Sequence, residues 1–198
     1  NSDKRCSLKV SRTHKDLVKR LFEMEVPEIY DGTVEVKAIS REAGSRTKIA
    51  VYSKDENVDA VGSYIGPKGI RVANIVDELN GEKIDVVKYS EDPAEFISQA
   101  LSPADVVSVE IVEGDIRACK VKVPDHQLSL AIGNKGQNAK LAARLTGFKI
   151  DIKSETQARE AGDFFDYENE YEDDEYYEED GGYNDADYQD DTEYSEEN

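Results

Sequence analysis

The apolar positions between residues 13 and 86 change their period several times, and each change predicts a new element. Residues 13–22 show the three-and-four spacing of a helix with one buried face. Residues 34–39 and 48–52 alternate apolar with polar positions, as the two strands of a hairpin do. Two further helices and a strand are predicted next, over 58–65, 72–79 and 82–86.

The same order of elements returns in the second part of the chain. Asp92 offers an N-cap, Pro93 the first helical position and Glu95 an acidic first turn, so a helix is predicted from here to residue 101. Two strands, two helices and a last strand are expected after it, over 106–112, 116–123, 126–132, 137–145 and 148–152. An order that occurs twice indicates a duplicated domain. Only Ser90-Glu91 separates this helix from the strand before it, so the two domains should be joined almost without a linker and in a fixed mutual orientation.

A short glycine turn lies between the last two helices of each copy. The sequence Ile-Gly-x-Lys-Gly occurs at Ile65 and again at Ile132. Glycines let a ligand approach the backbone with no Cβ in the way, and the helix that follows directs its free N–H groups outward. Such a helix start favours an anion, and the lysine adds a cation beside it. Two turns of this kind predict a ligand with repeated phosphates, which is a nucleic acid.

The candidate contacts lie in these turns and in the first turn of the helices behind them. Backbone N–H groups after each first glycine would receive phosphates, and the apolar side chains before it would accept bases. Arg71 and Lys140 lie about one helical turn along, whereas Gln137 and Asn138 place amides where they could read base edges, and Pro67 removes one donor. The predicted RNA-binding residues are Ile65, Gly66, Pro67, Lys68, Gly69, Arg71, Ile132, Gly133, Asn134, Lys135, Gly136, Gln137, Asn138 and Lys140. Four cations predict a single-strand salt slope of about −3.

These segments resemble a known family. A Gly-x-x-Gly between two helices, with a strand after the second, is similar to a KH domain, whose loop clamps about four nucleotides. The amino-acid sequence is closer to one group of such proteins than to KH domains in general. Residues 66–69, 74–79, 90–96, 101–104 and 128–133 all resemble the tandem KH region of the bacterial NusA family of transcription termination and antitermination factors. The resemblance runs from about Val10 to Glu155.

The resemblance implies an α+β fold of two consecutive type II, prokaryotic KH domains, over 12–89 and 90–155. Each would be a three-stranded mixed sheet with helices on one face, and residues 1–11 would be a remnant of a preceding OB-type barrel. It further implies single-stranded RNA binding in the cytoplasm during pausing, termination and antitermination. RNA polymerase would be contacted mainly through upstream parts, other transcription factors are further candidate partners, and a monomer is expected.

The net charge of the chain comes from its end. The 198 residues carry a formal charge of −19, which alone argues against a nucleic-acid ligand. From Glu155 onward there are 20 acidic residues and one basic residue, so the first 154 hold 24 of each. Residues 156–198 are therefore predicted to be a disordered, acidic, tyrosine-rich tail. Its carboxylates and rings imitate a single strand and could compete for the RNA site, or the tail could serve only solubility.

The sequence offers little support for catalysis or for a membrane. No nucleophile, histidine and acid converge in a motif, two cysteines are too few for a metal site, and no apolar run reaches membrane-spanning length. An enzyme and a cofactor are therefore not expected. Two alternatives stay open: a KH protein of the ribosome or of ribosome assembly, and a duplicated KH fold used for protein contacts.

The charged side of the first hairpin is predicted to face solvent. Lys37, Arg41, Arg46 and Lys48 occupy its polar positions, where they would serve solubility. Cys119 alternates with lysines on the other predicted hairpin and should face inward.

Overall fold

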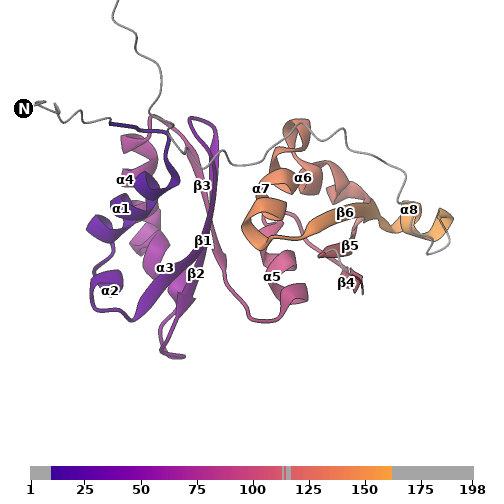
Figure 1. Cartoon of the computed structure of the whole chain (residues 1–198), viewed down its shortest axis with the longest axis horizontal. Helices are drawn as coiled ribbons and strands as arrows, with labels where there is room; N and C mark the ends of the chain where they lie inside the picture. The colour runs from indigo at the N-terminus through magenta and orange to yellow at the C-terminus, as the bar shows by residue number, and fades with distance from the viewer. Residues whose placement is uncertain (1–9, 113, 115–116, 162–198) are drawn as a thin grey trace, which may run out of the picture. The chain divides into compact units, whose positions relative to one another are not determined.

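The computed structural model describes residues 10–112, 114 and 117–161 (Figure 1). The first sheet has the order β1-β2-β3, with β1 (Val34–Glu42) antiparallel to β2 (Arg46–Ser53) and β2 parallel to β3 (Lys83–Lys88). The antiparallel pair is a hairpin, and the parallel pair is connected by helices, as a parallel connection requires.

The second sheet repeats this topology in the order β4-β5-β6. β4 (Ser108–Val112) is antiparallel to β5 (Ala118–Val123), and β5 is parallel to β6 (Lys149–Ser154). Both are the mixed three-stranded sheets that the resemblance implies, and the predicted fold class is confirmed. Cys119 faces inward as predicted, and burial raises the pKa of its thiol to about 12.

Four helices accompany the first sheet: α1 (Lys15–Glu25), α2 (Pro27–Tyr30), α3 (Ala60–Ile65) and α4 (Ile70–Glu78). Their apolar faces meet one face of the sheet in a core that includes Phe22, Ile49, Tyr64 and Ile75. The rings of Phe22 and Tyr64 are 5.1 Å apart at this centre, between α1 and α3. The core therefore holds α3, through Tyr64, and α4, through Ile75, against the sheet.

The helices of the second domain are α5 (Pro93–Ala100), α6 (Leu128–Ile132), α7 (Gln137–Thr146) and α8 (Glu155–Glu160). The predicted start of α5 is confirmed, because the Asp92 side chain accepts a hydrogen bond from the Ala94 N–H at 3.2 Å. α8 departs from the prediction of a tail from residue 156. Ser154 and Gln157 form a capping box that starts this helix, and residues 162–198 of the predicted tail lie outside the described residues.

The back face of the first sheet, opposite its own helices, packs against the second domain. Ala50 on β2 and Val87 on β3 belong to the same buried cluster as Ile97 of α5 and Ala142 of α7. Gln137, at the start of α7, also donates to the Glu42 carboxylate at 2.6 Å and the Ser45 hydroxyl at 2.7 Å. The two domains thus share a buried apolar cluster and side-chain hydrogen bonds, and the rigid joint stays a prediction.

The prediction that the charged side of the first hairpin faces solvent is wrong for Lys48 and Arg41. Lys48 is fully buried, and its ammonium donates to Asp85 at 3.1 Å and to the Ser102 carbonyl of the second domain at 2.7 Å. Burial lowers the pKa of Lys48. Burial opposes ionisation of Asp85 too, but hydrogen bonds from Arg46 and the charge of Lys48 outweigh it and lower the pKa of that carboxyl. The hairpin is covered by a domain that strand alternation alone does not reveal.

A second buried ion pair fastens the start of β3 to the hairpin. The Glu82 carboxylate accepts from Arg41 Nε at 2.8 Å, from the Thr47 hydroxyl at 2.6 Å and from the Gly44 N–H at 2.8 Å. The side chains of Glu82 and Arg41 are 1 % and 4 % exposed. Arg41 also donates to the His14 carbonyl, and the His14 side chain caps α1 by accepting from the Asp16 N–H.

Within the described residues, no helix is long and apolar enough to cross a membrane. The same residues contain no group of three or more His, Cys, Asp or Glu that could hold a metal ion. The segment predicted as a barrel remnant, residues 1–11, falls almost wholly outside the described part of the chain.

Candidate nucleic-acid interface

The two Gly-x-x-Gly turns have the same backbone conformation. Gly66 and Gly133 lie at φ 75°, ψ 172° and φ 77°, ψ 175°. The second glycines, Gly69 and Gly136, are both left-handed at φ 76°. Each turn is one short 3₁₀ segment between two helices, α3 and α4 in the first domain and α6 and α7 in the second. The two turns therefore share one backbone geometry, although Pro67 lacks the N–H that Asn134 carries at the equivalent position.

The lysines of both turns adopt a conformation that non-glycine residues rarely take. Lys68 has φ 54° and Lys135 has φ 53°, both in the left-handed region. Such a residue costs about 1–3 kcal/mol when it is held there, and sites of this kind cluster at functional positions. Both side chains are exposed, as is that of Lys140. Among the described residues, none of the three has an acidic partner within 4.0 Å.

The first glycine of each turn leaves room for a residue five positions later. A Cβ on Gly66 would lie 2.5 Å from Cγ of Arg71, and one on Gly133 would lie 2.8 Å from the backbone nitrogen of Asn138. The second glycines are different, because nothing lies within 4 Å of a Cβ built on Gly69. The first glycine therefore serves packing, whereas the second leaves the surface of the turn uncrowded.

Arg71 lies in the first helical turn of α4, directly after the first glycine turn, but its side chain is directed inward. Its guanidinium pairs with Glu28 of α2 at 3.0 Å and donates to the Ser63 carbonyl of α3 at 2.6 Å. The side chain is 21 % exposed. This cation holds α2 and α3 together, and its charge is already matched by a carboxylate.

Asn138 is the counterpart of Arg71 in the second domain, because each lies five residues after the first glycine of its turn. It is 3 % exposed, and its amide nitrogen donates to the carbonyls of Leu101 and Ala131, each at 3.0 Å. Gln137 is bonded to the hairpin of the first domain, as described above. The two amides predicted to meet base edges therefore hold the second turn in place.

Part of the backbone donor set is used by the turns themselves. The Gly66 N–H donates to the Gly62 carbonyl at 2.8 Å and the Gly69 N–H to the Gly66 carbonyl at 3.0 Å. The second turn repeats both bonds, from Gly133 to Ser129 and from Gly136 to Gly133. The donors that define the turn are thus distinct from those that a phosphate would use.

The apolar surroundings of the turns include two residues that sequence reasoning missed. Ile132 is 38 % exposed and Ile65 is half-buried. Ile70 and Leu130 are more exposed, at 58 % and 46 %. The sequence could have indicated that Ile70 is exposed, because Ile70 falls outside the apolar face of the helix predicted from Val72 onward. Pro67 and Asn134, the first variable positions of the turns, are both exposed.

The two glycines of the second turn should respond differently to alanine. A Cβ on Gly136 would make only an ordinary van der Waals contact, at 3.8 Å from Cε of Lys140, so Gly136→Ala costs only the left-handed penalty of about 1–2 kcal/mol. Gly133→Ala adds a clash with backbone that cannot rotate away, in a region of φ and ψ that is essentially limited to glycine. Urea unfolding should therefore show a clearly larger loss of stability for Gly133→Ala. Equal losses would contradict the packing role of the first glycine.

Comparison with known proteins gives the family. One family model, the NusA-like first KH domain, matches residues 12–89, and a second, the NusA-like second KH domain, matches residues 93–160. The chain is 65 % identical over 153 residues to the transcription termination/antitermination protein NusA of Bacillus subtilis, covering 77 % of this chain and 41 % of that protein.

Two other relatives of the same name agree. The protein of Mycobacterium tuberculosis strain H37Rv is 58 % identical over 146 residues, covering 74 % of this chain and 42 % of the relative. The protein of Thermus thermophilus is 50 % identical over 147 residues, covering 74 % and 38 %. The chain spans about two fifths of the length of these relatives. Its two glycine turns lie one in each matched domain, and the chain belongs to the family of NusA-like tandem KH domains.

Proposed function

We propose that the two Gly-x-x-Gly turns bind one continuous single strand of RNA, in the control of transcription elongation, pausing, termination and antitermination. The family's KH domains imply RNA binding, and the relatives are named for termination and antitermination. A role beside RNA polymerase in the cytoplasm, with the polymerase contacted mainly by other parts of the longer protein, follows from the same likeness. The chain acts by binding and not by catalysis.

The observation that supports this proposal most strongly is the pair of exposed lysines in identical left-handed turns. Lys68 and Lys135 stand beside the open second glycines, where a sugar-phosphate backbone can come close. The N–H groups of Lys68, Asn134 and Lys135 would meet the phosphate oxygens. The exposed apolar side chains next to the turns, Ile70 and Ile132 among them, would contact the bases, which single strands leave accessible.

The contacts between the domains explain how two turns can act on one strand. Gln137 begins the helix behind the second turn and is bonded to the hairpin of the first domain. Ala50 and Val87 bury the back face of the first sheet against α5 and α7. Once an RNA strand is bound at one turn, its neighbouring segment is held at a high effective concentration near the other turn. The affinity of the chain for that strand then exceeds the affinity of either turn alone.

The structure lowers the expected salt dependence of RNA binding. Arg71 is paired with Glu28, so three cations, Lys68, Lys135 and Lys140, are available instead of four. At about 0.7 per phosphate contact on a single strand, the slope of log affinity against log salt should be about −2. Doubling the salt should then weaken binding about fourfold. Fluorescence anisotropy over a salt series measures this slope, and a slope near zero would contradict phosphate recognition.

The same assay separates RNA binding from a role in protein contacts only. The chain should bind a labelled single strand much more tightly than a duplex of the same sequence, because a duplex hides its base edges and cannot enter a shallow turn. Failure to bind either form would contradict the proposal. Co-purification of the longer protein with RNA polymerase, or with ribosomes instead, would distinguish the transcription role from the ribosomal alternative.

A further inference from the structure

The back face of the second sheet differs from that of the first at two equivalent positions. Lys48 lies opposite Asp85 in the first sheet, and Lys120 lies opposite Asp151 in the second. Two residues further along the same strands, Ala50 lies opposite Val87 in the first sheet. Their counterparts in the second sheet, again opposite each other, are lysines: Lys122 on β5 and Lys153 on β6.

The difference in residue type at these positions follows from what covers the back face of each sheet. Ala50 and Val87 are buried against α5 and α7 of the second domain, where a charge would be costly. Lys122 and Lys153 have side chains that are 32 % and 31 % exposed. A face that carries lysines at these positions cannot accept a third domain in the way that the first sheet accepts the second. The ligand that fits such a face is an anion.

Among the described residues of β4, β5 and β6, the charged side chains on this lysine face are those of Lys120, Lys122, Lys149, Lys153, Glu110 and Asp151. The two carboxylates are loosely placed, since Lys122 is 3.5 Å from Glu110 and Lys153 is 3.7 Å from Asp151. Exposed pairs at such distances contribute about 0–1 kcal/mol. Other carboxylates can therefore replace them at little cost.

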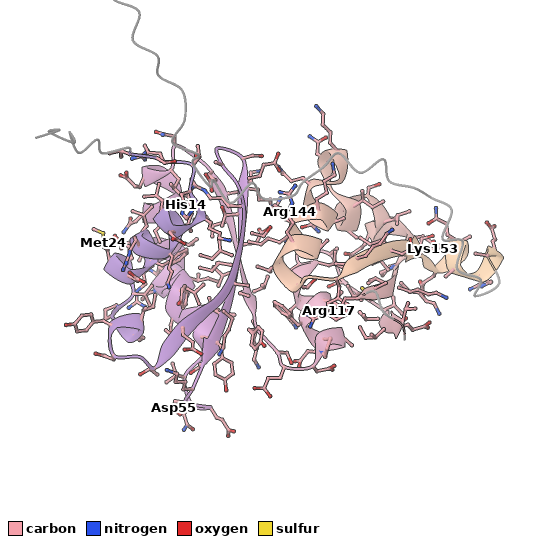
Figure 2. All side chains as sticks on the ribbon, in the orientation of Figure 1. His14, Met24, Asp55, Arg117, Arg144 and Lys153 are labelled. Carbon is pink, nitrogen blue, oxygen red and sulfur yellow. The ribbon has the colours of Figure 1, made fainter. Side chains whose placement is uncertain are left out.

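A strongly acidic segment of the same chain follows directly after the second domain. Residues 162–198 contain 18 acidic residues and neither lysine nor arginine. They follow α8, which contacts β5 and β6 and whose Thr156 is fixed to Asp125 by hydrogen bonds of 3.1 and 2.8 Å. α8 has six residues, about 9 Å at 1.5 Å per residue, so the acidic segment begins close to Lys122 and Lys153. Figure 2 shows Lys153 on β6 beside α8.

We propose that the acidic segment 162–198 docks on the lysine face of the second sheet in the same molecule. A tether of this length gives an effective concentration of about millimolar, so many weak contacts suffice. RNA is the less favoured occupant, because Ile150 and Ile152 direct the opposite side of β6 toward the helices that carry the turn. The docked segment keeps its carboxylates on the side of the sheet away from Lys135.

Paramagnetic relaxation in the full chain tests this proposal. A nitroxide is attached at Asn184→Cys in a Cys6→Ser background, and Cys119, which is 1 % exposed, stays unlabelled. At about 0.1 M salt, amides of 120–123 and 150–154 should lose more than half of their intensity. At about 1 M salt, where the screening length falls from roughly 10 to 3 Å, they should recover.

Charge variants give the matched control. Lys122→Glu with Lys153→Glu should abolish the broadening, and Lys122→Gln with Lys153→Gln should weaken it with less risk to folding. Lys19→Glu with Lys54→Glu makes the same charge change on the first domain and should leave it unchanged. Broadening at 66–69 and 133–136 instead would overturn the proposal and place the segment at the RNA turns. So would the absence of broadening, or RNA-induced shifts at Lys122 and Lys153 in its place.

Discussion

Glu82→Ala should lower the free energy of unfolding by about 3–5 kcal/mol, as expected when one partner of a buried ion pair is removed. The substitution leaves the Arg41 guanidinium, whose side chain is 4 % exposed, without its carboxylate. It also removes the acceptor of the Thr47 hydroxyl and of the Gly44 N–H. Because these groups join β1, the hairpin turn and β3, the loss should affect the whole first domain. Urea unfolding followed by circular dichroism measures it.

An exposed pair in the same domain provides the control. Glu78 contacts Arg12 at 3.1 Å, but both side chains are more than half exposed. Glu78→Ala should therefore cost no more than about 1 kcal/mol. If Glu82→Ala and Glu78→Ala destabilise the chain equally, the buried cluster around Glu82 does not hold the first sheet together.

Acid should act on the same cluster. Burial opposes ionisation of Glu82, but hydrogen bonds from Arg41, Thr47 and Gly44 outweigh it, so its pKa lies below the ordinary 4.5. A lowered carboxyl pKa contributes stability that is complete above 4.5 and is lost as the pH falls through the folded-state pKa. The difference in unfolding free energy between wild type and Glu82→Ala should therefore be full at pH 7 and shrink as the pH falls through that acidic range. A difference that stays constant with pH would contradict this linkage.

The repeated order of elements could be predicted from the sequence because its signals are local. Period-two segments, helical stripes and the Asp92-Pro93 helix start are each set by residues a few positions apart. The two glycine turns were found in the same way, since positive φ at Gly69 and Gly136 requires that residue type or strain. The likeness of the two copies then gave the domain order.

The partners of particular side chains could not be predicted, because they come from distant parts of the chain. Nothing near Arg71 indicates that Glu28 will neutralise it, and nothing near Asn138 points to the Leu101 carbonyl. Lys48 follows the same strand alternation as an exposed lysine, yet the second domain covers it. Alternation tells which residues share a face, whereas what lies against that face is decided by tertiary packing.

Replacing both turn lysines should have the largest effect on RNA binding. Asp is tolerated in the left-handed region that Lys68 and Lys135 occupy, so Lys68→Asp with Lys135→Asp should keep the backbone of both turns. It changes two attractive contacts with phosphate into repulsive ones. At about 0.1 M salt, the loss of one contact between a lysine and a single-strand phosphate lowers RNA affinity roughly fivefold. Changing the lysine charge to a negative charge about doubles that free-energy change. For the two turns together, affinity should therefore fall on the order of 100-fold or more.

The most direct measurement is the dissociation constant of a labelled single-stranded RNA for three forms of the full chain at one salt concentration. These are wild type, the Lys68→Asp and Lys135→Asp variant, and the Lys19→Glu and Lys54→Glu variant, which has the same net charge. The turn variant should lose on the order of 100-fold in affinity, and the control much less. Equal affinities for wild type and the turn variant, with both folded, would contradict RNA binding at the two turns.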